Sequence, residues 1–367
     1  MHPVVSTTAR ARPGSAAREI AAMRRAVELS ASGAGATYPN PSVGCVVLDA
    51  AGEVVGEGRT ADGGRPHAEV VALAAAGTRA QGGTAVVTLE PCAHTGGTPP
   101  CVEALRAAGV ARVVVAVRDP HALAAGGAEA LRGYGLDVEV GLLAAEAAHA
   151  QRAWLHGVRA GRPYVTWKFA ATLDGRTAAS DGTSRWITGP AARADVHRLR
   201  AQADTILAGV GTVLADDPQL TVRRPDGTAA ERQPLRVVID SHGRTPAGAR
   251  VRDNAAPTLV VTAADHPGPD GRVDPVALLE RLYADGRRHV FLEGGATLAG
   301  AFVAAGLVDE VVAYLAPALL GDGVAALQHA GITSIDGALR LDVTEVVQVG
   351  TDVRITAVPR PTEQQEV

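Results

Sequence analysis

Aromatic side chains, cysteines and long apolar runs are all scarce in this chain. Phe, Trp and Tyr make up 3% of the 367 residues, and there are three cysteines. Three cysteines are too few, and odd in number, for a disulfide framework. A net charge of −4, together with the shortage of aromatic stacking platforms, argues against a nucleic-acid partner. Because no apolar run reaches the roughly 20 residues of a membrane-spanning helix, we expect no membrane partner either.

The length suits two ordinary domains with Ala-, Val- and Leu-rich cores. Residues 1–17 contain Arg, Ser and Thr but no acid, a composition with some transit-peptide character. We interpret them as a disordered extension, and residues 359–367 as a disordered tail. The boundaries predicted for the two domains are 18–150 and 160–358.

Strand and helix patterns alternate in both halves, which predicts α/β layers around largely covered sheets. In the first half, we expect strands at 43–48, 53–58, 85–89 and 113–117, and helices at 70–76 and from residue 101. In the second half, we expect strands at 164–169, 205–208, 236–240, 258–262, 289–292 and 311–315, and helices at 191–203 and from residue 297.

The most informative residues are His67-Ala68-Glu69, followed by Cys92 and Cys101. One imidazole and two thiolates make a zinc site with an open coordination position for water, which the metal activates. This order of residues is typical of zinc nucleobase deaminases, in which the Glu is a proton shuttle and not a ligand. The alternative is a non-catalytic zinc module, but such a site would need a fourth ligand and has no use for Glu69. Thiolate ligands also suit a reducing, cytoplasmic location.

Three segments extend this signature: Tyr38–Val46, Pro66–Val70 and Pro91–Cys101. Together they resemble the bifunctional deaminase–reductases of riboflavin biosynthesis, in which the two cysteines stand farther apart than in tRNA and cytidine deaminases. The resemblance implies a cytidine-deaminase-like three-layer α/β/α domain followed by a dihydrofolate-reductase-like α/β domain. It also implies one Zn²⁺ per chain, NADPH as second cofactor, and a homo-oligomer.

Within the first domain, the resemblance makes His67, Cys92 and Cys101 the metal ligands and Glu69 the catalytic residue. Asn40 resembles a substrate contact, with a turn-forming Asn before Pro as the alternative. We interpret Cys45 as a core residue.

Two positions in this domain depart from the family. Gly97 replaces a basic residue that would meet the substrate phosphate, a contact that Arg65 could supply instead. The loop Asp119–Ala122 carries His121 in place of an Asn. We favour a solvated loop residue there over a polar contact.

In the second half, local sequence patterns do not by themselves identify a binding site. Gly209 and Gly211 lack the third glycine of a dinucleotide fingerprint, and Glu293–Thr297 fits a phosphate loop or a structural turn equally well. The resemblance favours the cofactor loop. The cofactor positions it implies are Ala171, Trp186, Thr212, Asp216, Ser241, Gly295, Ala296, Thr297, Leu298, Ala299, Gly300 and Ala301. The substrate positions that it implies in this half, in addition to Asn40 in the first domain, are Lys168, Ser184, Arg200, Leu220, Arg223 and Glu293. The two arginines are suited to a sugar phosphate.

The sequence therefore predicts a two-step enzyme with a pyrimidine ribonucleotide substrate. The first domain would deaminate 2,5-diamino-6-(ribosylamino)pyrimidin-4-one 5′-phosphate by hydrolysis, and the second would reduce the ribosyl side chain to ribityl with NADPH. One alternative is a deaminase whose C-terminal domain only binds substrate or mediates oligomerisation. A nucleic-acid-editing deaminase is another, which the acidic charge and the cysteine spacing oppose.

Overall fold

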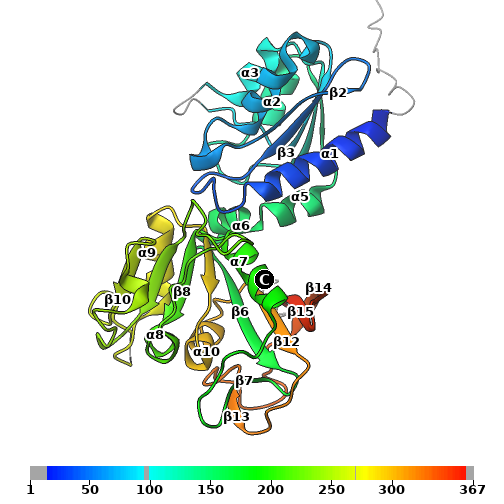
Figure 1. The fold of residues 1–367 in the computed structure, drawn as a ribbon. Coiled ribbons are helices and arrows are strands. Elements are labelled where there is room, and N and C mark those ends of the chain that lie inside the picture. Colours follow the sequence, from blue (N-terminus) through cyan, green and yellow to red (C-terminus); the bar gives the residue numbers. More distant parts are fainter. Residues whose placement is uncertain (1–14, 95–98, 269, 361–367) are drawn as a thin grey trace, which may run out of the picture. The chain divides into compact units, whose positions relative to one another are not determined.

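The computed structural model describes residues 15–94, 99–268 and 270–360, and shows two compact units that divide between Val158 and Arg159 (Figure 1). Helix α1 (Ser15–Ser32) begins inside the range 1–17 that we predicted as an extension. Strand β15 (Asp352–Pro359) ends at the first residue of the predicted tail. Residues 1–14 and 361–367 of the two predicted ends lie outside the described residues.

The first unit is built on a five-stranded sheet. Its order is β2 (Val54–Arg59), β1 (Gly44–Leu48), β3 (Thr84–Leu89), β4 (Arg112–Val117) and β5 (Asp137–Val140). Strand β1 is antiparallel to β2 and β3, whereas β3, β4 and β5 run parallel. Because parallel strands end at one edge of a sheet, the segments that follow β3 and β4 lie close together.

Helices cover both faces of this sheet. One layer contains α1 and α5 (Ala144–Ala150), and the other contains α2 (Ala68–Ala76), α3 (Cys101–Ala107) and α4 (Gly127–Gly133) (Figure 1). Successive residues of β1 point to opposite faces of the sheet: Val46 packs in the core cluster with α1, and Val47 packs in the core cluster with α2. Cys45 is fully buried, as predicted for a core residue. The predicted three-layer α/β/α architecture is confirmed.

The second unit contains an eight-stranded sheet. Its order is β10 (Thr258–Val261), β9 (Leu235–Ile239), β8 (Thr205–Gly209), β11 (His289–Leu292), β6 (Tyr164–Thr172), β12 (Glu310–Ala316), β15 and β14 (Leu341–Val349). The six strands from β10 to β12 are parallel, and β15 and β14 add an antiparallel edge. The short strands β7 (Arg176–Ala179) and β13 (Gly323–Ala325) form a separate pair.

Helices α9 (Pro275–Ala284) and α10 (Ala296–Ala304) pack on one face of the large sheet. Helices α7 (Pro190–Arg200) and α8 (Val210–Asp216) belong to separate core clusters with other residues of the strands. Helix α6 (Arg152–Ala160) contains the division between the units. The remaining helical turns are η1 (Asp62–Gly64), η2 (Gly77–Ala80) and η3 (Arg250–Arg252). Both predicted α/β units are therefore confirmed.

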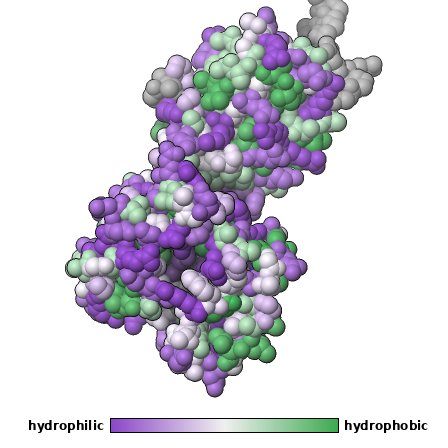
Figure 2. Space-filling model, in the orientation of Figure 1, coloured by the Kyte–Doolittle hydropathy of each residue, from purple (hydrophilic) through white to green (hydrophobic). Residues whose placement is uncertain are grey.

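On the face drawn in Figure 2, hydrophilic residues predominate and hydrophobic ones form separate patches among them. In the part of the chain that the structure describes, no helix combines the length and apolar character that a bilayer crossing requires. The apolar side chains are concentrated instead in the core clusters between helices and sheets.

Candidate active sites

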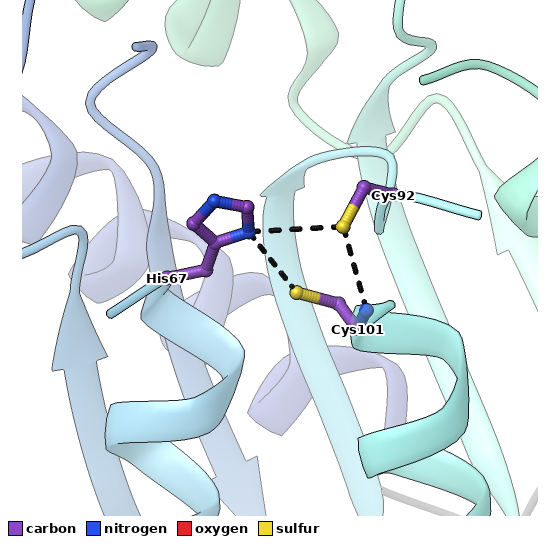
Figure 3. A group of neighbouring side chains, drawn as sticks. All are labelled: His67, Cys92 and Cys101. Carbon is purple, nitrogen blue, oxygen red and sulfur yellow. Dashed lines mark hydrogen bonds between the residues drawn. The ribbon is translucent and has the colours of Figure 1, made fainter. Parts of the chain in front are cut away.

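Three elements of the first unit bring His67, Cys92 and Cys101 together (Figure 3). His67 is the residue that precedes α2, Cys92 follows the end of β3, and Cys101 is the first residue of α3. The Nδ1 atom of His67 lies 3.3 Å from Cys101 Sγ and 3.7 Å from Cys92 Sγ. The three side chains, although 34 residues apart at their extremes, thus converge on one point.

This donor set fits a zinc ion. Zinc–nitrogen and zinc–sulfur bonds of about 2.0 and 2.3 Å, in a tetrahedron, place the two donor atoms about 3.5 Å apart. The two distances of 3.3 and 3.7 Å lie on either side of that value. Within the described ranges, the group contains no fourth His, Cys or carboxylate ligand. One coordination position is therefore left for a small molecule, as in catalytic zinc sites.

Local hydrogen bonds favour a thiolate at Cys92. Hydrogen bonding from the Cys101 side chain, against the effect of burial, lowers the pKa of Cys92 to about 4. The backbone N–H of Cys101, at the start of α3, also donates to Cys92 Sγ over 3.4 Å. Thiolate is the form of cysteine that binds metals.

Glu69 lies in the first turn of α2 and is only 4% exposed. Burial raises the pKa of its carboxyl group, and the nearby His67 opposes that effect. A buried acid with a raised pKa, beside but outside the donor set, has the properties of a proton carrier.

The other residues predicted for this site lie around it. Asn40 is half-buried, and its side-chain amide donates to the carbonyl oxygen of Gly64, 24 residues along the chain, over 2.9 Å, so its substrate contact stays a prediction. Arg65 is exposed, yet close enough for its charge to act on the imidazole of His67. His121 is exposed on its loop. Gly97 lies outside the described residues, so its replacement of a basic contact stays a prediction.

In the second unit, the predicted cofactor residues follow neighbouring parallel strands. Ala171 is near the end of β6, and Thr212 and Asp216 lie in α8 directly after β8. Ser241 follows β9, and Gly295–Ala301 follow β11. Because β9, β8, β11 and β6 are adjacent in the sheet, these residues share one edge of it. Ligands of open α/β sheets bind outside the carboxyl ends of the strands.

Two of the predicted cofactor positions are suited to a dinucleotide. Gly295 precedes α10 and is exposed, and a Cβ built on it would meet no atom nearer than Thr212 Oγ1 at 4.0 Å. A phosphate could therefore approach its backbone and the first N–H groups of the helix. Trp186 is 69% exposed, with the guanidinium of Arg193 over its ring at 4.5 Å. The side chains fit the predicted NADPH.

Lys168, Arg200 and Glu293 form a connected charged cluster. Two nitrogens of the Arg200 fork donate to the two carboxylate oxygens of Glu293, the Nη2–Oε2 distance being 2.9 Å. Its third nitrogen, Nη1, donates to the carbonyl oxygen of Thr221 over 2.8 Å. Lys168 Nζ lies 4.0 Å from Glu293 Oε2. Burial lowers the pKa of Lys168. Burial acts to raise the pKa of Glu293, but the charge and hydrogen bonds of Arg200, together with the charge of Lys168, lower it overall.

The remaining predicted substrate residues are less tightly connected. Arg223 is exposed, and its guanidinium donates to Gln219 Oε1 over 3.2 Å. Leu220 is buried with a φ of 51°, a left-handed conformation that is rare for a branched residue. Ser184 is half-buried in the segment between β7 and α7. The structure does not bring Ser184 into the charged cluster.

Sequence reasoning missed two residues of α7. Arg193 stacks on Trp186, and His197 Nδ1 accepts a hydrogen bond from the backbone N–H of Arg223 over 3.2 Å. Their spacing from Arg200, by seven and three residues, places all three on one face of a helix. That spacing was a signal in the sequence, but it has no meaning until one of the three is known to face the site.

The fold and the first site define the class of cytidine-deaminase-like zinc hydrolases, joined here to a second α/β unit with a dinucleotide-binding edge. Comparisons with known proteins agree. Residues 17–117 match the cytidine and deoxycytidylate deaminase zinc-binding region, and residues 163–355 match the RibD C-terminal domain.

Relatives resemble the chain over nearly its whole length. The riboflavin biosynthesis protein RibD of Mycobacterium tuberculosis is 48% identical over 340 residues, which cover 92% of this chain and 97% of that protein. The Escherichia coli protein of the same name is 44% identical over 355 residues, covering 90% and 96% of the two chains.

Solved structures give the same result for the fold. RibD of Acinetobacter baumannii matches with a TM-score of 0.85 and 41% identity, over 94% of this chain and 99% of that one. A Thermotoga maritima structure, described as a diaminohydroxyphosphoribosylaminopyrimidine deaminase/5-amino-6-(5-phosphoribosylamino)uracil reductase, matches with a TM-score of 0.85 and 32% identity, over the same shares.

The chain belongs to the RibD family of riboflavin biosynthesis proteins. It is a bifunctional enzyme with a zinc-dependent deaminase domain and an NADPH-dependent reductase domain. The alternative of a C-terminal domain without an activity of its own is not favoured, because that half matches the RibD reductase domain.

Proposed function

We propose that His67, Cys92 and Cys101 hold the zinc ion and that Glu69 carries the protons of the deamination. The substrate we propose is 2,5-diamino-6-(ribosylamino)pyrimidin-4-one 5′-phosphate, which corresponds to the name of the Thermotoga maritima relative. The observation that carries this proposal is the convergence of three donor atoms beside a buried acid that is not a ligand.

Bound zinc supplies Lewis acidity that makes water nucleophilic near neutral pH. The carboxylate of Glu69 takes a proton from the attacking water and delivers it to the exocyclic nitrogen, which leaves as ammonia. Its position in the first turn of α2, two residues from His67, keeps it beside the reacting atoms. Water thereby replaces the amine, and the ring gains a carbonyl oxygen.

In the second unit, we propose that Arg223 receives the substrate phosphate, because its guanidinium is exposed. Arg200 was predicted to share this role, but each of its three guanidinium nitrogens already donates a hydrogen bond to Glu293 or Thr221. We therefore assign Arg200 to the substrate site as the residue that orients Glu293. NADPH supplies the hydride chemistry when bound, and the edge formed by Ala171, Ser241 and Gly295 would hold it.

Replacing Glu69 by Gln tests the deaminase assignment. We expect the variant to retain zinc and to lose ammonia release by about 10²- to 10⁴-fold, since a neutral amide cannot carry the proton. Glu103→Gln, which removes a half-buried acid on α3 that pairs with Arg106, is the matched control and should keep wild-type activity. Ammonia release at the wild-type rate from the Glu69 variant would refute the assignment.

A homo-oligomer and a cytoplasmic location remain predictions. Thiolate ligands support a reducing compartment. The state of assembly is measurable by size-exclusion chromatography with light scattering, and a monomer at all working concentrations would refute that prediction.

A further inference from the structure

Glu90 is a buried acid for which the proposed deamination has no use. It stands between the end of β3 and Cys92, and only 4% of its surface is exposed. A carboxylate in such surroundings is costly unless both of its oxygens are hydrogen-bonded. Arg118, the nearest cation, is 4.0 Å away with a side chain that is 54% exposed, so it contributes little.

Two backbone amides satisfy this carboxylate instead. The N–H of Asp119 donates to Oε2 over 3.0 Å, and the N–H of Ala128 donates to Oε1 over 2.8 Å. Asp119 follows β4, and Ala128 lies at the start of α4. One side chain thus ties the end of β3 to two separate points of the segment between β4 and α4.

Further contacts join the same two segments. The N–H of Ala93 donates to the carbonyl oxygen of Ala124 over 3.3 Å. At Gly127, an added Cβ would lie 1.8 Å from the carbonyl oxygen of Pro91, so only glycine allows this approach. Residues 90–93 are therefore attached on one side to the segment 117–128, while Cys92 Sγ faces His67 and Cys101 on the other (Figure 3).

We propose that Glu90 is a positioning residue for the deaminase: its two hydrogen bonds hold the backbone of Cys92 so that Sγ stays in the metal donor set. The inference rests on the zinc site of the proposed function. Groups that orient metal ligands change metal affinity by about 10- to 100-fold when they are removed. The same carboxylate anchors Asp119, so it also fixes the base of the loop that carries His121.

The chemistry of the contact suggests the decisive substitution. Gln has nearly the shape of Glu, but only one of its two terminal atoms accepts a hydrogen bond. In Glu90→Gln, either Asp119 or Ala128 would therefore face an NH₂ group with its own N–H. The substitution therefore removes one of the two hydrogen bonds, and the other can still form.

The experiment compares Glu90→Gln with Glu129→Gln in the full-length enzyme. Glu129 is an exposed acid on α4 whose partners are Arg118 and Arg132, so its loss leaves the Cys92 backbone untouched. Zinc affinity is measured by competition with a chromophoric chelator, and the site is also probed with Co²⁺ through its thiolate absorption. The kcat and KM of ammonia release complete the set.

We expect zinc affinity to fall by about 10- to 100-fold in Glu90→Gln, with an altered Co²⁺–thiolate spectrum and a lower kcat. NADPH oxidation with the deaminated intermediate should equal wild type, because it takes place in the other unit. Gly127→Ala should weaken zinc binding in the same direction by pressing on Pro91. Zinc affinity and Co²⁺ spectra equal to those of Glu129→Gln would overturn the proposal, even if the variant were less stable. Failure of wild-type enzyme to bind zinc would instead refute the proposed metal site.

Discussion

Glu293 carries its charge inside the second unit because Arg200 forms a two-pronged pair with it. Lys168 adds a second cation at 4.0 Å. Such a cluster is costly to break, since removal of one partner leaves a buried charge behind. Arg223, by contrast, has an exposed guanidinium and one neutral partner, Gln219. At the residue scale, Arg223 is therefore the arginine of the pair that is free to meet a phosphate.

Replacing Arg223 by Ala should weaken phosphate recognition in the reductase. Hydrogen bonds to charged groups are worth about 1.5–3 kcal/mol, which corresponds to a loss of about 10- to 150-fold in kcat/KM. The loss should be much smaller for the dephosphorylated intermediate, and both are measured as NADPH consumption. Arg224→Ala, an exposed neighbour, is the control. An equal loss with both substrates would contradict the assignment.

At the scale of elements, Arg236 on β9 joins two segments that lie far from it in sequence. Its side chain is fully buried and donates to Asp253 Oδ1 over 2.8 Å and to the carbonyl oxygen of Gln219 over 3.1 Å. Gln219 precedes Leu220, a predicted substrate residue with left-handed backbone. Strand β9 thereby holds the backbone from which Arg223 projects.

The ion pair makes stability depend on pH. Hydrogen bonds from Arg236 lower the pKa of Asp253 from 3.8 to about 2. The ionised form is therefore favoured in the folded state, and this stabilisation is present above pH 4 and lost as the pH falls through about 2. Solvent screens the pair, since 37% of the Asp253 side chain is exposed.

We expect Asp253→Asn to lower the unfolding free energy at pH 7 by a modest amount, with a difference from wild type that shrinks as the pH falls towards 2. Chemical denaturation followed by circular dichroism measures both values. Asp336→Asn, which removes an exposed acid, is the control. A difference that stays constant across this pH range would contradict the prediction.

At the scale of the whole molecule, the two activities reside in units with separate cores. Within the described residues, the candidate metal ligands all belong to the first unit. Metal removal should therefore act on one activity alone.

A strong chelator should abolish ammonia release and leave NADPH oxidation with the deaminated intermediate unchanged. The chelated enzyme should also lose thermal stability in one transition and not in the other, because a bound metal stabilises only the unit that binds it. Differential scanning calorimetry with added Zn²⁺, or with Mg²⁺ as control, measures this. Loss of both activities on chelation would refute the separation.

Motif spacing was enough to predict the zinc cluster, and strand and helix periods were enough to predict two α/β units. His and Cys are recognisable as metal ligands from their residue types, so the site of His67, Cys92 and Cys101 could be predicted before any contact was known. Strand β14 was not predicted, although its apolar residues Leu341, Val343, Val347 and Val349 stand at alternate positions. The stacking of Arg193 on Trp186 could not be predicted, since a cation and a ring seven residues apart have no local signature.

The sequence by itself determined the metal chemistry, the layer class and the order of the two domains, because these depend on residue type and periodicity. Only the tertiary structure decided that Arg200 is committed to Glu293, that Arg223 is left exposed, and that Glu90 is held by two distant amides. Those facts depend on which strands become neighbours. Hydrogen-bond partners across a sheet are set by register and packing, which no local pattern encodes.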